Sequence, residues 1–266
     1  MASVDEASDD LATLPSISLA QLVELADLQE RFESKHLIPT SQLSIFLREL
    51  AERCGSVNVL EIDGRRSQHH TNEYFDSPDM QLYRYHVQGR RRRYKVRTRR
   101  YESDPVVYAE LKTKDGRGRT VKHRIALPGR QMTELPTDVS SSLHDELQRI
   151  HAGLVPVELM HSASVRYRRA TLVLEGDGDA AAERVTIDRD VVAVRRGALR
   201  HLGRSCSIVE VKSARPHAVA TAALVSLGHR PTSLSKYCLA VASVDDAERS
   251  HPWISVLRAL GAGAGT

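Results

Sequence analysis

The sequence predicts a mainly β protein of the α+β class, in which an antiparallel sheet closes into a tunnel and a few helices flank it. Two observations support this class. Between residues 57 and 127, apolar and polar residues alternate with a period of two in short runs. Turn sequences separate those runs, namely SPD at 77–79, SDP at 103–105 and DG at 115–116. Alternation that is interrupted by such turns is typical of a strand meander.

The segments before the meander are predicted from their capping and periodicity. Residues 1–17 are acidic and lack apolar periodicity, so we expect a disordered tail there. Ser18 followed by Gln21 forms a capping-box pattern, which predicts a short helix. Residues 32–38 look extended, and a second helix follows them and ends before Gly55.

Helices and strands alternate after the meander. Amphipathic helices are predicted over residues 140–150 and 216–227, and strands around 165–174, 184–188 and 208–212. A chain of 266 residues is long enough for one sizeable core. We therefore expect a single domain over residues 18–250, with residues 251–266 as a second tail.

Composition excludes several classes of protein. Hydrophobic residues make up 41% of the chain and charged residues 27%, and no run of about 18 apolar residues is present. The first residues are acidic and lack the features of a secretory signal. A soluble, cytoplasmic protein is expected. The three cysteines have no ligand spacing, and His69 and His70 have no third partner, so zinc is not predicted.

Charged side chains occupy one face of several predicted strands. In residues 94–99, Lys95, Arg97 and Arg99 alternate with apolar or neutral residues. The same alternation places further charged or polar residues on one face of later strands: Glu110, Lys112, Lys114, Lys122, Arg124, Arg184, Thr186, Asp188, Glu210 and Lys212. Such a face is either the solvated outside of a half-buried sheet or the inside of a closed barrel.

The abundance of lysine and arginine on this face favours the inside of a barrel that holds a polyanion. Two like charges at 4 Å repel by about 4 kcal/mol at an effective dielectric of 20, and a bound anion would relieve that repulsion. Phosphate chains suit the arrangement because arginine binds phosphate oxygens through paired hydrogen bonds. The glutamates would hold Mg²⁺ or Mn²⁺, which prefer oxygen ligands.

An ordered series of motifs resembles the VTC domain, which is named for the vacuolar transporter chaperone and lies in the triphosphate tunnel metalloenzyme superfamily. The motifs are YFDSPD at 74–79, YKVRTR at 94–99, ELKTK at 110–114, YRR at 167–169, VTID at 185–188, VEVK at 209–212 and SKY at 235–237. The likeness covers residues 25–241. It implies an antiparallel tunnel of about eight strands and a polymerase that extends inorganic polyphosphate with the γ-phosphoryl group of ATP and a divalent ion.

The resemblance also implies roles for particular residues. Those expected to grip phosphates are Lys35, Arg97, Arg99, Arg184 and Tyr167, with Lys122, Arg124 and Lys212 lining the same lumen. Those expected to act on the transferred group are Lys112, Arg169 and Lys236. Glu210 is expected to ligate Mn²⁺ or Mg²⁺, and Glu110 is a second candidate ligand. The chain departs from the family at Ser233, where a lysine is common, and at Leu172, which replaces an aromatic residue.

Phosphoryl transfer requires mainly in-line positioning and cations at the oxygens where charge develops, and this residue set suits that demand. If water replaces the growing chain as acceptor, the same lumen is a triphosphatase. A third reading is a non-catalytic protein that binds polyphosphate, or binds nucleic acid through GRRRRY at 89–94. Nucleic acid is the less favoured ligand because basic residues also recur in distant strands.

Overall fold

The computed structural model describes residues 11–26, 32–114, 120–127, 129, 131–154, 157–175, 182–245 and 251–261. Its strands are β1 (Ser16–Ile17), β2 (Phe32–Pro39), β3 (Ser56–Leu60), β4 (Gln68–Asp76), β5 (Tyr94–Tyr101), β6 (Asp104–Lys114), β7 (Thr120–Leu127), β8 (Met160–Glu175), β9 (Glu183–Arg195), β10 (Ala198–Leu202) and β11 (Cys206–Ser213). Its helices are α2 (Leu19–Ala26), η1 (Thr40–Gln42), α3 (Leu43–Arg53), α4 (Gln81–Val87), α5 (Thr137–Ile150), α6 (Val219–Ser226), α7 (Lys236–Val244) and α8 (His251–Ala259).

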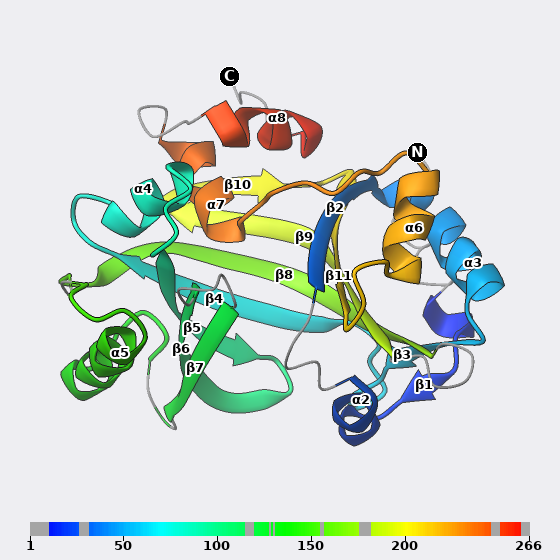
Figure 1. The fold of residues 1–266 in the computed structure, drawn as a ribbon, viewed down its shortest axis with the longest axis horizontal. Coiled ribbons are helices and arrows are strands. Elements are labelled where there is room, and N and C mark those ends of the chain that lie inside the picture. The colour runs from blue at the N-terminus through cyan, green and yellow to red at the C-terminus, as the bar shows by residue number, and fades with distance from the viewer. Residues whose placement is uncertain are drawn as a thin grey trace.

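One curled sheet organises the molecule (Figure 1). Its strands follow the order β2-β11-β9-β8-β4-β5-β6-β7, and every neighbouring pair on this path is antiparallel. The predicted antiparallel, mainly β class with flanking helices is therefore confirmed. In the described part of the chain, however, no backbone ladder joins β2 to β7, so the sheet is a tunnel-like curl rather than a closed barrel.

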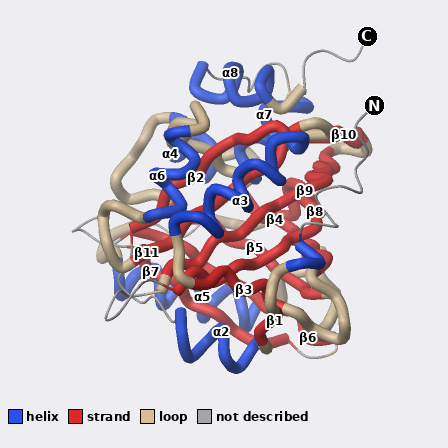
Figure 2. The backbone as a smooth tube through the Cα atoms, turned by 90° about the vertical axis from the view of Figure 1, so that its right-hand side faces the viewer, coloured by secondary structure: helices blue, strands red, loops and turns tan. Residues whose placement is uncertain are grey.

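Helices α3, α5 and α6 cover the outer face of the sheet. Figures 1 and 2 show α3 and α6 side by side on one flank, where they contact each other and contribute to a core with β8, β9 and β11. On the opposite flank, α5 packs against β5 and β6 through Leu143 and Leu147, which meet Val96 and Leu111. The apolar residues of the alternating strands therefore face these helices, and the alternating charged residues face inward.

Helix α7 packs against the inner face at the end of the tunnel where β5 begins. Its apolar residues Leu239 and Val241 are completely buried in the same core as Val165 and Tyr74. A helix that is apolar on all sides is stable only when it is surrounded by protein. Tyr237 fixes its position, because the ring stacks on Tyr74 at 5.1 Å between centroids. This placement brings the first residue of α7 to the tunnel interior.

The predicted capping box is present at α2. The backbone N–H of Ser18 donates to Gln21 Oε1 at 2.8 Å, and the N–H of Gln21 donates back to the Ser18 hydroxyl at 3.3 Å. The predicted turn at 115–116 lies outside the described residues. In the described chain, no helix combines the length and apolar character that a bilayer crossing requires.

Both segments that were expected to be tails contribute described residues to the fold. Ser16–Ile17 pairs with β3 in parallel, and Leu11 is buried beside α3; residues 1–10 lie outside the described part. At the other end, Trp253 and Leu257 of α8 are buried against α7. The sequence did not reveal these contacts because short segments show too few apolar residues to establish a period.

Candidate functional site

Strand register gathers the charged residues onto one continuous inner surface. Arg97 of β5 lies opposite Glu110 of β6, and Glu110 lies opposite Arg124 of β7. Lys112 lies in the same way between Lys95 and Lys122. Directly opposed residues of neighbouring strands point to the same side of a sheet. Since the other side of β5 and β6 packs on α5, these charges line the tunnel.

Glu110 is the centre of the first charge cluster. Its side chain is only 1% exposed, and its carboxylate accepts hydrogen bonds from Arg97 and Arg124 and an ion pair from Lys122 at 2.8 Å. Burial alone would raise the pKa of Glu110, but the charges of Arg97, Arg99 and Lys122 hold that pKa well below its usual range. Four cations, Arg97, Arg99, Lys122 and Arg124, thus share one anion and are held close together.

Asp188 is the centre of a second cluster on the facing wall. Its carboxylate is completely buried and accepts hydrogen bonds from Arg169 Nε at 2.6 Å and Nη2 at 2.8 Å. Lys236 is the first residue of α7, and its Nζ lies 2.5 Å from Asp188 Oδ2, the oxygen that also accepts from Arg169 Nη2. The Tyr167 ring lies under both cations, with centroid distances of 5.2 Å to Arg169 and 4.9 Å to Lys236. Burial opposes ionisation of Asp188, but these cations lower its pKa.

Glu210 belongs to a third cluster, together with residues of β2. Glu210 is paired with Lys35 in the strand register, and its carboxylate lies 2.7 Å from Lys212 Nζ. Glu33 forms an ion pair with Lys35 and lies 3.9 Å from Lys112 Nζ, which reaches it from β6. The Lys112 contact links the two walls of the curl where no backbone ladder joins them.

Burial disfavours the charged form of two lysines on this surface. Burial is the main cause that lowers the pKa of Lys95 to about 8, and the charges of Lys112 and Lys35 add to it. Burial likewise lowers the pKa of Lys112 to about 8, although Glu33 raises it in part. An anion bound among them would favour their charged forms.

All of the residues that the sequence analysis selected come to this inner surface. They are Lys35, Arg97, Arg99, Glu110, Lys112, Lys122, Arg124, Tyr167, Arg169, Arg184, Glu210, Lys212 and Lys236. Arg184 is placed by its register opposite Lys212, and Arg99 donates to Asn72 Oδ1 at 2.9 Å. Their chemical roles stay predictions.

Sequence reasoning missed several contributors to the surface. Glu33 alternates with Lys35 in an extended segment, and this signal was available but was not used. Asp188 was seen in the alternation but was given no role. His70 was given no place in the site, and it is buried there and stacks on Tyr167 at 5.2 Å. Burial, aided by the charges of Arg169 and Arg99, lowers the pKa of His70 to about 2, so the ring is neutral.

The carboxylates differ in how well they suit a divalent ion. Around Glu110, Arg97, Lys122 and Arg124 already engage both oxygens, which favours a role in holding cations. Glu210 lies opposite Thr186, whose buried hydroxyl has no hydrogen-bond partner within the described ranges. No group of three or more His, Cys, Asp and Glu residues suited to a metal occurs in the described chain.

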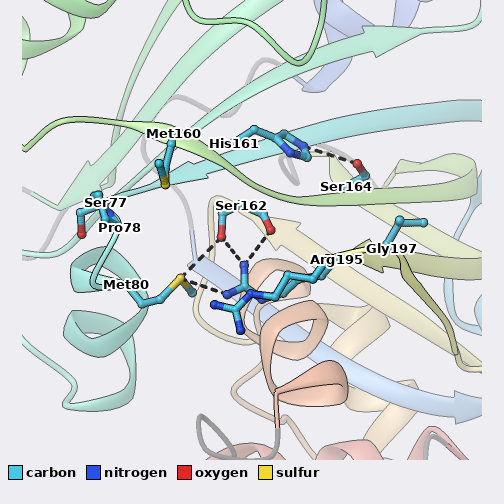
Figure 3. A pocket seen from close by; sticks show the side chains of 11 residues that line it. Ser77, Pro78, Met80, Met160, His161, Ser162, Ser164, Arg195 and Gly197 are labelled. Carbon is cyan, nitrogen blue, oxygen red and sulfur yellow. Dashed lines mark hydrogen bonds between the residues drawn. The ribbon is translucent and has the colours of Figure 1, made fainter.

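A separate pocket of about 410 Å³ lies outside this surface (Figure 3). None of its lining residues belongs to the three clusters. Arg195 donates there to the carbonyl and hydroxyl of Ser162 and forms an ion pair with Asp245 at 2.8 Å, while His161 contacts Glu73 at 2.7 Å. These polar groups satisfy one another, in contrast to the crowded cations of the tunnel.

Comparison with solved structures finds similar proteins at low identity and with TM-scores under 0.5. A candidate adenylate cyclase from Bacillus halodurans is 15% identical, with a TM-score of 0.44, covering 75% of this chain and 87% of that one. A candidate adenylyl cyclase from Hippeastrum, described as having a dominant triphosphatase activity, is 14% identical, with a TM-score of 0.49, covering 84% and 100%. A protein from Pyrococcus horikoshii is 14% identical, with a TM-score of 0.44, covering 79% and 95%.

No curated protein sequence matches the chain significantly. The sequence does match the VTC domain over residues 30–245, a range that runs from just before β2 to the end of α7 and includes every residue of the three charge clusters. The match extends over most of the 266 residues. The chain therefore belongs to the VTC domain family.

Proposed function

We propose that this protein is a metal-dependent phosphotransferase that moves the γ-phosphoryl group of ATP onto the end of an inorganic polyphosphate chain. The observation that carries the proposal is the inner surface of the curled sheet, where cations from β2, β5, β6, β7, β8, β9, β11 and α7 greatly outnumber the carboxylates. Membership of the VTC domain family supports the same reaction class.

The clusters suggest how the triphosphate is held. Arg97 and Arg99 come from β5 and Arg169 from β8, two strands that both pair with β4, so the three guanidinium groups would bind phosphates from different parts of the curled wall. Guanidinium groups bind phosphate oxygens through paired hydrogen bonds, which fixes orientation as well as charge. The carboxylates of Glu110 and Asp188 keep these guanidinium groups in place before the substrate arrives, which lowers the cost of ordering them on binding.

Lys112 and Lys236 suit the stabilisation of charge on the transferred group. In the transfer, the bond between the γ-phosphorus and the β–γ bridging oxygen breaks, and a terminal oxygen of the acceptor chain forms the new bond. ADP leaves, and the acceptor is one phosphate longer. Lys112 reaches the tunnel from β6 and Lys236 from α7, so they approach the transferred group from different walls.

A divalent ion, Mn²⁺ or Mg²⁺, would be held by Glu210 with phosphate oxygens. Glu33 lies close enough to Glu210 for their charges to interact: burial and the Glu210 charge oppose ionisation of Glu33, but Lys112 and Lys35 leave its pKa lowered. Two nearby carboxylates, and a Thr186 hydroxyl that has no hydrogen-bond partner among the described residues, provide the oxygen ligands that such ions prefer. When bound, the ion would neutralise charge on the β- and γ-phosphates.

Incubation of the protein with ATP and Mn²⁺ tests the reaction, with polyphosphate resolved on a gel and free phosphate measured in parallel. The proposal expects long chains. Phosphate release without chains would instead identify a triphosphatase that uses water as acceptor. If neither chains nor free phosphate form, the protein would be a non-catalytic binding protein. Arg97→Ala should reduce synthesis by about 10²-fold. Arg100→Ala is the matched control, because the adjacent side chain is exposed on the outer face.

A further inference from the structure

The connection between α4 and β5 carries a dense positive charge that the tunnel clusters do not include. Gly89 to Arg93, which we term the arginine loop, contains four consecutive arginines after a glycine. Arg90, Arg91 and Arg92 are exposed, and Arg93 is half-buried. Within the described chain, none of the four forms an ion pair with a carboxylate. Charged groups this close together repel one another unless an anion lies among them.

The loop has a defined shape. Gly89 has a φ of 63°, a conformation that glycine adopts without steric cost. Arg93 donates to the carbonyl oxygen of Arg90 at 2.6 Å, which closes the loop, and the guanidinium of Arg90 lies 4.5 Å over the Tyr85 ring. Arg91 and Arg92 have no side-chain hydrogen bond within the described residues, and both are exposed in the middle of the loop.

The arginine loop lies at the end of the tunnel where the basic wall begins. Arg93 precedes Tyr94, the first residue of β5, and its carbonyl accepts a hydrogen bond from Thr113 at 3.2 Å. Lys95 is the next inward residue, and it lies opposite Lys112, which lies opposite Lys122. A series of basic side chains therefore continues from Arg99 through the strand into the loop.

Part of the basic wall reaches solvent on β6 and β7. The side chains of Lys112, Lys122 and Arg124 are 44%, 39% and 39% exposed, whereas those of Arg99 and Arg169 are 10% and 13% exposed. The field of the same cations reaches α4. Burial is the main cause that lowers the pKa of His86 to about 2, and the charges of Lys95, Arg93 and Lys112 add to it.

We propose that the arginine loop is a second anion-binding site, outside the tunnel, which holds the part of an inorganic polyphosphate chain that extends beyond the tunnel. The inference rests on the proposed function, since the tunnel must bind the other end of the same chain. A polyphosphate carries charge at regular intervals along a flexible backbone, so it can contact lysines inside and arginines outside at once. Two linked contacts on one chain strengthen binding beyond either alone.

The site makes a specific prediction about ligand length. Tripolyphosphate is short and is expected to bind in the tunnel only, whereas a long chain is expected to reach the loop. Arg91→Ala/Arg92→Ala removes two exposed charges without removing any hydrogen bond of the described structure. Arg100→Ala/Arg166→Ala is the matched control. These two exposed arginines flank Thr71 on the outer face, and replacing them removes the same amount of charge.

Calorimetric titration of the full chain at fixed salt concentration tests the inference with tripolyphosphate and with long-chain polyphosphate. The expected result is that Arg91→Ala/Arg92→Ala weakens long-chain binding about five- to tenfold while tripolyphosphate binding is unchanged. The control pair should leave both affinities unchanged. Equal losses in the two double variants would overturn the inference, because they would reflect only total charge.

Other outcomes separate the two proposals. If both ligands bind the wild type but the loop variant loses nothing, the loop site is refuted and the tunnel function stands. If neither ligand binds the wild type, the proposed function fails and the loop inference fails with it. A single-stranded RNA of matched charge serves as competitor. RNA that binds more tightly than polyphosphate, and only when the loop is intact, would assign the loop to nucleic acid and overturn the inference.

Discussion

The guanidinium of Arg97 donates two hydrogen bonds to one carboxylate oxygen of Glu110, from Nε at 2.8 Å and from Nη2 at 2.6 Å. The same carboxylate also receives Lys122 and Arg124 through its other oxygen. A single buried anion therefore fixes the positions of several cations from β5 and β7. Glu110 is therefore a suitable position at which to test how much a shared counter-charge stabilises the folded protein.

Glu110→Gln should lower the free energy of unfolding by about 2 kcal/mol, because the buried cations lose their shared counter-charge while Lys122 and Arg124 remain partly solvated. Chemical denaturation measures this change. Added tripolyphosphate should restore much of the lost stability, since it supplies negative charge to the same cations. Glu102→Gln, in an exposed pair with Arg65, is the control and should have little effect. Equal stability of Glu110→Gln and wild type would contradict the role given to Glu110.

The stability that Glu110 contributes should be present at neutral pH and lost at acidic pH. Its folded pKa lies below the ordinary value of 4.5, so the unfolded chain takes up the proton first as pH falls. The contribution is therefore fully present above about pH 4.5 and is lost progressively below it. Thermal midpoints measured from pH 7 to pH 3 should fall more steeply below pH 4.5 for the wild type than for Glu110→Gln. Parallel curves for the two proteins would argue against the depressed pKa.

Binding of tripolyphosphate should weaken as pH rises through about 8. Burial and neighbouring cations lower the pKa of Lys112 to about 8, so this side chain loses its charge in that range. Lys112→Arg should bind with a smaller pH dependence, because a guanidinium stays protonated. Isothermal titration between pH 7 and pH 9.5 measures the difference. Lys95, with a similarly lowered pKa, should account for the dependence that remains in the variant.

Lys236→Met should reduce polyphosphate synthesis by about 10²-fold, because a cation aimed at the transferred group is lost. The fold should persist, since α7 is held mainly by its apolar residues and by Tyr237. Synthesis is followed on gels, and circular dichroism checks the fold. A rate close to that of wild type, in a protein that is correctly folded, would remove Lys236 from the catalytic set and leave it as a counter-charge for Asp188.

Trp253→Ala should destabilise the protein by about 3 kcal/mol, because a large buried side chain of α8 leaves a cavity against α7. Arg258→Ala changes an exposed residue of the same helix and serves as the control. Denaturant midpoints for the two variants provide the comparison. If both variants match the wild type, α8 does not contribute to the stability of the domain, as the sequence analysis had expected for residues 251–266.

Much of this surface could be predicted from the sequence, because side chains alternate between the two faces of a strand however the sheet curves. Arg97, Lys112 and Glu210 could be assigned to one face from alternation alone. Which face is inside could not be read from alternation, and the family resemblance was needed for that step. The structure shows the reason: Val96 and Leu111 are covered by α5, whose contact with these strands is long-range and leaves no local signal.

Partners across the tunnel were the hardest to foresee. Asp188 was visible as one polar residue in a strand, but its role as anchor for Arg169 and Lys236 depends on where α7 lies. Glu33 became important only because β2 approaches β6, which brings it near Lys112. Closure of the sheet was predicted by analogy with the family fold, and it depends on pairing between β2 and β7, which are distant in sequence.

The gap between β2 and β7 affects how a polymer would enter. Along the described residues, this seam is spanned by the side-chain contact of Lys112 with Glu33 rather than by a ladder of amides. A fully laddered cylinder would force any long substrate to thread by a free end. Here side-chain contacts rather than a continuous ladder join the described edges, and the Thr232 N–H covers part of the free edge of β2 by donating to the Lys35 carbonyl at 2.6 Å, so we expect this seam to separate more readily than a laddered wall.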